Sequence, residues 1–232
     1  MNANHHDSSI ATLIVFCRRP AAGIGKRRIA ADLGNERTLQ LSQHLLAATL
    51  EDASAWPGPV VISPAELTDS EWATTLLEPQ PSVAAQPNGN LGERINTVDR
   101  NVRTHKDQKL IYIGSDAPLL NDPYYETARS ALNDHDIVLG AAEDGGVVLM
   151  GARTAWPDLA SLPWSSEKLG MELELLCKMH GLTVKHLETC YDIDNARDLP
   201  RLRTDLQHDV RPARQALQQW LESAGLDQDN VT

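Results

Sequence analysis

Short, nearly continuous runs of apolar residues recur along this chain, and such runs are typical of strands buried on both faces of a parallel sheet. The clearest runs are Leu-Ile-Val-Phe-Cys at residues 13–17 and Leu-Ile-Tyr-Ile at residues 110–113. The whole pattern predicts strands at residues 13–17, 60–62, 82–85, 110–113, 137–139, 147–150 and 182–186.

Between most of these runs, apolar residues recur every three or four positions, which predicts amphipathic helices. The predicted helices cover residues 35–54, 69–77, 91–104, 122–132, 167–180, 195–204 and 211–223. Because strands that alternate with helices form βαβ units, we expect a single-domain, three-layer α/β/α sandwich with a mostly parallel central sheet. The expected organisation is a disordered N-terminus at residues 1–9, one domain at residues 10–225 and a flexible tail at residues 226–232.

The charge and composition exclude several classes of protein. A formal net charge of −11 over 232 residues argues against binding to a nucleic-acid backbone. No apolar run reaches the roughly 18 residues of a membrane helix, and the N-terminus lacks the pattern of a signal peptide. The three cysteines form no C-x-x-C pair, so neither a disulfide framework nor a zinc ribbon is predicted. We therefore expect a cytoplasmic protein with no nucleic-acid and no membrane partner.

Positive charge is concentrated directly after the first predicted strand. Five of the 21 lysines and arginines lie within residues 18–28, among them Arg18, Lys26 and Arg28, and Gly23 allows the backbone to approach a ligand. The segment is neither a Walker A loop nor a Rossmann fingerprint, because required glycines and a hydroxyl residue are absent. It is either a phosphate-binding segment or a solvated basic loop, and its position after a buried strand favours phosphate binding.

A carboxylate lies at the end of the strongest predicted strand, in the segment Gly-Ser-Asp-Ala-Pro at residues 114–118. Ligands of open α/β sheets bind at the carboxyl ends of the strands. Asp116 therefore offers a hard oxygen ligand to a divalent cation at such an end. On local sequence alone, a turn aspartate is an equally good interpretation.

A pair of carboxylates follows the last predicted strand. Asp192 and Asp194 are two positions apart, so both point the same way in extended backbone and can supply further metal ligands. Alternatively, Asp194 or Asn195 caps the helix that follows.

Two more segments are candidates for the site. Glu143 and Asp144 form an acidic turn before a strand, and either is a candidate general base or part of an ordinary tight turn. Residues 86–94 connect a strand to a helix and are either a ligand-binding loop or only a connection. No H-E-x-x-H or G-x-S-x-G motif is present, so zinc-protease and serine-hydrolase chemistry are unsupported.

The order and spacing of these segments match a known set of motifs. The pattern Pro-x-x-Gly-x-Val-Lys-Thr-Arg-Leu is matched at Pro20, Gly23, Lys26 and Arg28, and Gln-x-x-Gly-x-Leu-Gly-x-Arg at Gln86, Gly89, Leu91, Gly92 and Arg94. Gly-Ser-Asp-x-Pro is intact at residues 114–118, and Asp-x-Asp-Thr-x-x-Asp-Leu is matched at residues 192–199 except at Asn195. From about residue 13 to residue 202, the chain thus resembles a bacterial family of arsenosugar-biosynthesis-associated glycosyltransferases. That family belongs to the GT-A, or nucleotide-diphospho-sugar transferase, superfamily.

The resemblance implies a GT-A-like fold and a metal-dependent transferase that acts on a nucleotide-sugar diphosphate. It implies Mg²⁺ or Mn²⁺ as the cofactor, held by Asp116 with Asp194 and Asp192. It places Lys26 and Arg28 at the phosphates. The full set of residues predicted to bind the nucleotide and its phosphates is Arg18, Gly23, Lys26, Arg28, Gly89, Gly92, Arg94 and Ser115, and the candidate catalytic residues are Asp116, Asp144 and Glu143. The implied partners are a nucleotide sugar or NTP and a small-molecule acceptor, and a homodimer is compatible with this reading.

The chain also departs from the family's motifs, at Gly25, Arg27, Val147 and Asn195. Val147 replaces the tyrosine of an Asp-Gly-Gly-Tyr motif and so removes a ring that would stack on a ligand. These departures indicate a divergent member. Glycosyl transfer is the leading interpretation, with nucleotidyl transfer from an NTP, or a catalytically silent nucleotide-binding protein, as the alternatives.

Overall fold

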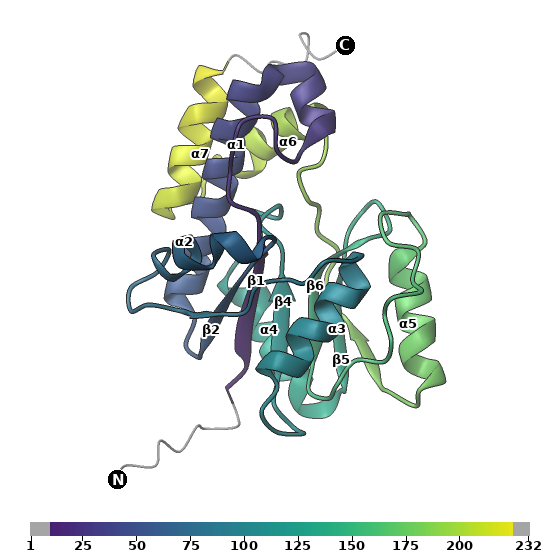
Figure 1. Ribbon diagram of the computed structural model, residues 1–232. Helices are drawn as coiled ribbons and strands as arrows, with labels where there is room; N and C mark the ends of the chain where they lie inside the picture. Colours follow the sequence, from purple (N-terminus) through teal and green to yellow (C-terminus); the bar gives the residue numbers. More distant parts are fainter. Residues whose placement is uncertain (1–9, 225–232) are drawn as a thin grey trace.

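Seven strands form one sheet in the order β3-β2-β1-β4-β6-β5-β7 in the computed structural model, which describes residues 10–224 (Figure 1). The N-terminus predicted to be disordered, residues 1–9, and the tail predicted to be flexible, residues 226–232, lie outside the described residues. The strands are β1 Thr12–Cys17, β2 Val60–Pro64, β3 Ser82–Val83, β4 Leu110–Ile113, β5 Ile137–Ala141, β6 Val147–Ala152 and β7 Val184–His186.

The sheet is mostly parallel, as predicted, and β6 is the exception. It lies antiparallel to both of its neighbours, β4 and β5. Only residues 142–146 join β5 to β6, and a connection this short links antiparallel strands. The turn at residues 142–146 therefore lies at the same edge of the sheet as the carboxyl ends of the parallel strands.

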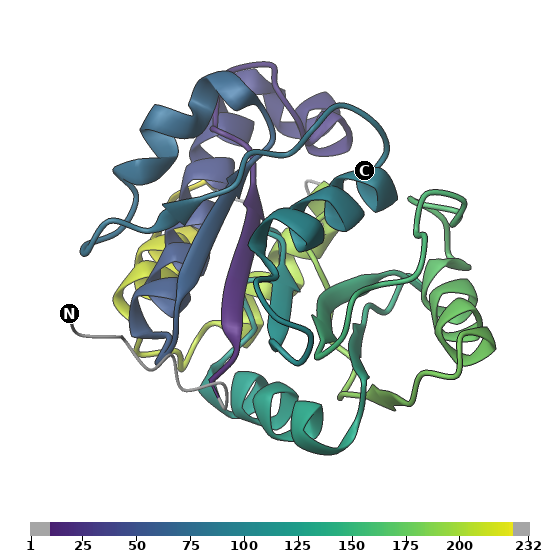
Figure 2. The ribbon, with the colours of Figure 1, turned by 60° about the horizontal axis from the view of Figure 1, so that its bottom comes forward.

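Helices cover both faces of the sheet and give the predicted three-layer fold (Figures 1 and 2). They are α1 Arg27–Ala55, α2 Ser70–Thr74, α3 Leu91–Val102, α4 Asp122–Asp134, α5 Leu169–Met179, α6 Leu199–Asp205 and α7 Pro212–Ser223, with 3₁₀ turns η1 Leu67–Asp69 and η2 Ala196–Asp198. Helices α1, α2 and α4 pack on one face of the sheet, and α3 and α5 pack on the other. No helix within residues 10–224 is long and apolar enough to cross a membrane.

The helix predicted at residues 35–54 is confirmed, and a helical segment that the sequence pattern did not predict precedes it. Helix α1 begins at Arg27 and is interrupted by non-helical backbone at Gly34, where φ is 77°. The early turns are stabilised by burial of Ile29 in a cluster with residues of α6 and α7 beyond the edge of the sheet (Figure 1). Because these partners lie about 170 residues away in the chain, local periodicity does not reveal them. Arg27 and Arg28 are consequently helical, and the basic loop ends at Lys26.

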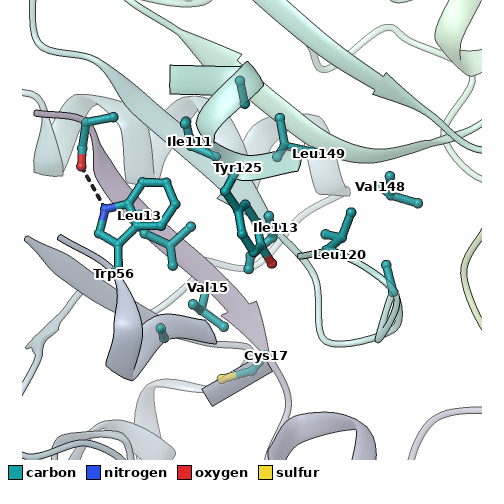
Figure 3. Close-up of a cluster of buried hydrophobic side chains, with 14 of the residues drawn as sticks. Leu13, Val15, Cys17, Trp56, Ile111, Ile113, Leu120, Tyr125, Val148 and Leu149 are labelled. Atoms are coloured by element: carbon teal, nitrogen blue, oxygen red, sulfur yellow. Dashed lines mark hydrogen bonds between the residues drawn. The ribbon is translucent and has the colours of Figure 1, made fainter. Parts of the chain in front are cut away.

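One hydrophobic cluster fixes β1 against the helices of its face (Figure 3). Leu13 and Val15 of β1 are fully buried there, beside the rings of Trp56 and Tyr125. These two rings pack edge to face with centroids 5.6 Å apart. The Trp56 indole donates to the carbonyl of Ala11, 2.8 Å away, so the ring is fixed by a hydrogen bond as well as by packing.

A buried ion-pair network joins α7 to the rest of the domain. The Arg214 side chain is fully buried and donates to the carboxylate of Asp52 on α1, at 2.6 Å. It also donates to the carbonyl of Pro118, at 3.0 Å, in the segment that follows β4. Arg211 adds a second ion pair to Asp52, at 3.1 Å. The guanidinium of Arg214 thus connects α7, α1 and the segment that contains Asp116.

We expect Arg214→Met to reduce the free energy of unfolding by roughly 3–5 kcal/mol, because it removes one partner from a buried, hydrogen-bonded charge network. Urea unfolding followed by circular dichroism measures this loss. The control is Lys178→Ala, which removes an exposed pair with Glu174 on α5 and should change stability by less than about 1 kcal/mol. Equal effects of the two substitutions would contradict the anchoring role of Arg214.

Candidate functional site

The strand order creates a crevice between β1 and β4. The chain places β2 and β3 on one side of β1 and then returns to place β4 on the other side. Ligands of open α/β sheets bind at such a reversal, outside the carboxyl ends of the strands. The loops that leave this point are residues 18–26 after β1 and residues 114–118 after β4.

Lys26 joins three segments at this crevice. Its ammonium lies 2.7 Å from Oδ1 of Asp116 and donates to the carbonyl of Ile193, also at 2.7 Å. The backbone N–H of Ile193 donates in turn to the carbonyl of Asp116, at 2.8 Å. Only 12% of the Lys26 side chain is exposed, and its backbone is left-handed, with φ of 39°. The predicted cationic loop, the strand-end aspartate and the late acidic segment therefore meet.

The predicted acidic residues also influence one another. The pKa of Asp192 is raised to about 6, chiefly by burial and additionally by the neighbouring carboxylates of Asp194, Asp144 and Asp116. The backbone N–H groups of Asp194 and Asn195 both donate to the carboxylate of Asp198, at 3.0 and 2.7 Å. Asp198 thus orders the acidic segment, which leaves the carboxylates of Asp192 and Asp194 to face other groups.

Glu143 is engaged in a different contact. Both of its carboxylate oxygens accept from Arg201, at 2.6 and 2.8 Å. These hydrogen bonds lower the pKa of Glu143. The Arg201 guanidinium in turn lies over the ring of Tyr191, 3.9 Å from its centroid. This arrangement favours a structural role for Glu143 over a role as general base, and leaves Asp144 as the better candidate.

Three cavities adjoin these residues. The first has a volume of about 250 Å³, and its lining includes Arg18, Lys26, Arg94, Ser115 and Asp116. The second, about 760 Å³, is lined in part by Arg28, Glu143, Asp144, Asp192, Asp194 and Arg201. The third, about 210 Å³, shares Asp116 with the first cavity and Asp192 with the second. The three cavities therefore follow one another along the carboxyl edge of the sheet.

The residues predicted to bind phosphate do not all line the same cavity. Arg28 lies on α1 with 70% of its side chain exposed, 3.6 Å from Asp194, and lines the second cavity with that residue. Gly23, Gly89 and Gly92 line none of the three cavities. Gly92 is required by packing, because a Cβ atom there would lie 2.1 Å from the carbonyl oxygen of Leu159.

Two residues of the candidate site are not predicted by the sequence. Phe16 lines the first and third cavities from the end of β1, where the sequence shows only an apolar strand residue. Arg201 lies 58 positions from its partner Glu143, on a short helix that also carries Arg203. No local pattern distinguishes either residue, because each acquires its role from a contact made in the folded chain.

Comparison with known proteins gives the chain a family and a fold. Residues 45–166 match the family described as "Uncharacterized protein conserved in bacteria (DUF2064)". The chain belongs to this family. No curated protein matches its sequence. The narrower resemblance to arsenosugar-associated glycosyltransferases stays a prediction.

Several solved structures share the fold. The proposed nucleotide-diphospho-sugar transferase from Desulfovibrio desulfuricans G20 is 22% identical, with 92% of this chain and 96% of that chain covered and a TM-score of 0.82. A CMP:2-keto-3-deoxy-manno-octonic acid synthetase in complex with CTP is 14% identical over 86% of this chain and 100% of that chain, with a TM-score of 0.52. A 4-diphosphocytidyl-2C-methyl-D-erythritol synthase from Anaerococcus prevotii DSM 20548 is 12% identical over 86% and 100%, with a TM-score of 0.50. These similarities confirm the predicted nucleotide-diphospho-sugar transferase fold.

We expect Lys26→Met to loosen the acidic segment, since it removes the ammonium that bridges Asp116 and Ile193. The amide of Ile193 should then exchange its hydrogen about tenfold faster, as the loss of one charge-assisted hydrogen bond implies. Hydrogen–deuterium exchange read by NMR measures this. The control is Arg28→Met. The exposed side chain of Arg28 lies 3.6 Å from Asp194, so its replacement should leave the exchange rate of the Ile193 amide nearly unchanged. Unchanged exchange in Lys26→Met would show that the bridge does not hold the segment.

Proposed function

We propose that this protein is a metal-dependent transferase of the GT-A type that uses a nucleotide-sugar diphosphate and passes the sugar to a small-molecule acceptor. The observation that carries this proposal is the meeting of Lys26, Asp116 and the segment at residues 192–194 in the crevice between β1 and β4. A cation and several carboxylates together suit the binding of a diphosphate and its counter-ion.

The first cavity is suited to the diphosphate part of a nucleotide. Arg18, Arg19, Lys26 and Arg94 all line it, so four cations surround a volume of about 250 Å³. Arg94 is held in place by donating to the carbonyl of Gly89, at 2.9 Å, and to the side chain of Gln86, at 3.4 Å. Guanidinium groups positioned in this way match phosphate oxygens in two-point contacts. The CTP complex of a synthetase with the same fold supports a nucleotide as the ligand.

The acidic residues fit Mg²⁺ or Mn²⁺ by the chemistry of their donor atoms. Asp116, Asp192 and Asp194 offer hard carboxylate oxygens. The pKa of Asp192 is raised first by burial and then by neighbouring carboxylates, whose negative charge a divalent cation would offset. Within residues 10–224, no three histidine, cysteine, aspartate or glutamate side chains are grouped so as to hold a metal ion by themselves. Mg²⁺ commonly binds through one or two carboxylates together with substrate phosphates, so two protein ligands suffice. When bound, such a cation neutralises the charge that develops on the diphosphate.

The chain's own residues have distinct roles in this reaction. The bond between the anomeric carbon and the diphosphate oxygen breaks, and the nucleoside diphosphate leaves with the electron pair. The acceptor oxygen forms the new bond, and its proton passes to a base, for which we assign Asp144 in the second cavity. Lys26 and Arg18 stabilise the leaving diphosphate from the first cavity.

Nucleotidyl transfer is the second candidate, because the same cations are suited to a triphosphate. An acceptor phosphate would then attack the α-phosphorus of an NTP and release pyrophosphate. Two of the structures that share this fold are named as synthetases that use or form cytidine nucleotides. A silent nucleotide-binding protein is the third candidate.

The released product separates the three candidates. We expect the protein to bind a nucleotide sugar in a thermal-shift panel containing Mg²⁺ or Mn²⁺, and to release a nucleoside diphosphate in the presence of acceptors. Asp116→Asn should lower kcat by about 100- to 1,000-fold, the typical effect of removing one group that stabilises transition-state charge. EDTA should abolish turnover.

The control for this test is Asp134→Asn, which changes an exposed carboxylate at the end of α4 and should leave turnover unchanged. Release of pyrophosphate from an NTP would replace the glycosyl-transfer proposal by nucleotidyl transfer. If the protein binds a nucleotide but releases neither a nucleoside diphosphate nor pyrophosphate, it is a catalytically silent nucleotide-binding protein. Full metal-dependent turnover in Asp116→Asn would remove Asp116 from the centre of the site.

A further inference from the structure

The third cavity, about 210 Å³, has an apolar lining although it lies among charged residues. Of the residues that line it, Ile95, Tyr112 and Met150 are buried, and Phe16 and Val147 are partly exposed. Leu91 at the start of α3 also lines it and is 41% exposed. Ile95, Tyr112 and Met150 belong to the hydrophobic cluster that packs α3 and α5 against the sheet, and Phe16 and Val147 pack against that cluster.

The polar atoms of its aromatic side chains are already engaged. The hydroxyl of Tyr112 donates to Asp99, at 2.6 Å, and the indole N–H of Trp164 donates to the carbonyl of Leu159, at 2.9 Å. The backbones of Tyr112 and Met150 are paired in the antiparallel ladder between β4 and β6. A hydroxyl group of a ligand would therefore find few hydrogen-bond partners on this surface. Burying a hydroxyl group without such a partner costs free energy and weakens binding.

Among the described residues that line the third cavity, the charged side chains are those of Asp116 and Asp192. Asp116 lies at the boundary with the first cavity and Asp192 at the boundary with the second. These are the carboxylates that the proposed function assigns to the metal and the reacting diphosphate. The apolar surface consequently adjoins the place where the transferred group would be attached.

The residues that line the third cavity also indicate which part of the substrate occupies it. The third cavity shares four residues with the nucleotide cavity, namely Phe16, Leu91, Gly114 and Asp116, and shares only Asp192 with the larger charged cavity. It is therefore an extension of the nucleotide cavity, and the group attached directly to the diphosphate is the one that reaches it. Its volume is below the range typical of cavities that enclose a whole drug-sized ligand, so it suits one part of a ligand.

We propose that this cavity binds the transferred sugar and selects a 6-deoxy sugar, whose methyl group replaces a hydroxyl group, over the corresponding hexose. This inference rests on the proposed function, because it needs a sugar attached to the diphosphate. The methyl group is buried against Phe16, Val147 and Met150, whereas the hydroxyl of the parent sugar loses its water without gaining a partner.

Matched pairs of nucleotide sugars test the selection. The pairs are the glucose and 6-deoxyglucose derivatives of UDP, dTDP, ADP and CDP, and GDP-mannose with GDP-6-deoxymannose, each measured with Mg²⁺ by isothermal titration calorimetry. For the base that the protein accepts, we expect the 6-deoxy member to bind about tenfold more tightly, a discrimination of the size that one apolar group supplies. Equal binding within the pair, or tighter binding of the hexose, overturns the inference.

A nearly isosteric substitution tests whether the lining is the cause. Val147→Thr keeps the shape of the side chain and adds a hydroxyl group to the lining, so the preference for the 6-deoxy member should fall about fivefold, as a new hydrogen-bond partner for the hexose implies. The control is Val210→Thr, which makes the same chemical change at a side chain that is 80% exposed and outside all three cavities, and it should keep the full preference. An unchanged preference in Val147→Thr overturns the assignment to this cavity.

The failure of this inference is distinguishable from the failure of the proposed function. UDP, dTDP, GDP, ADP and CDP are titrated alongside the sugars. If none of the diphosphates and none of the nucleotide sugars binds, the proposed function fails and this inference fails with it. If a diphosphate binds and the two members of its pair bind equally, only the selection of a 6-deoxy sugar is wrong.

Discussion

The parallel pairing of β1 with β4 is the constraint on which the rest of the site depends. The two strands are in register from Thr12 beside Leu110 to Val15 beside Ile113, so they end at the same edge of the sheet. Burial of their alternate side chains in two opposite clusters fixes this register, because a shift of one residue would exchange the two faces. Every residue that we assign to the diphosphate leaves from these strand ends or is brought to them.

The positive and negative charges at this edge of the sheet offset one another only in part. Several carboxylates face one another, and Lys26 offsets part of their repulsion through Asp116. Lys26 adopts a left-handed backbone in doing so, a conformation that is unfavourable for a residue with a side chain. A strained cation among repelling carboxylates is typical of a site prepared for a ligand. A diphosphate and a divalent cation together would satisfy both signs of charge.

Apolar and charged surfaces alternate along the same edge. The first cavity presents cations, the third presents side chains of a hydrophobic cluster, and the second presents mixed charges that include the Glu143–Arg201 pair. The antiparallel strand β6 is responsible for much of this order, since it brings both the turn with Asp144 and the apolar Val147 to the carboxyl edge. A sheet built only of parallel strands would have placed the start of that strand at the opposite edge.

The sequence by itself determined the class of fold and predicted which residues the candidate site contains. Apolar runs alternating with helical periodicity predict the α/β sandwich, since burial on both faces of a strand requires such runs. Motif spacing identified Lys26 and Asp116 because glycine, lysine and aspartate at strand ends are local signals. Only the tertiary structure decided which of these residues meet. Arg28 was separated from Lys26 by the start of α1 at Arg27, and Arg201 joined the site through a contact across 58 positions. Both depend on long-range packing, which local periodicity does not encode.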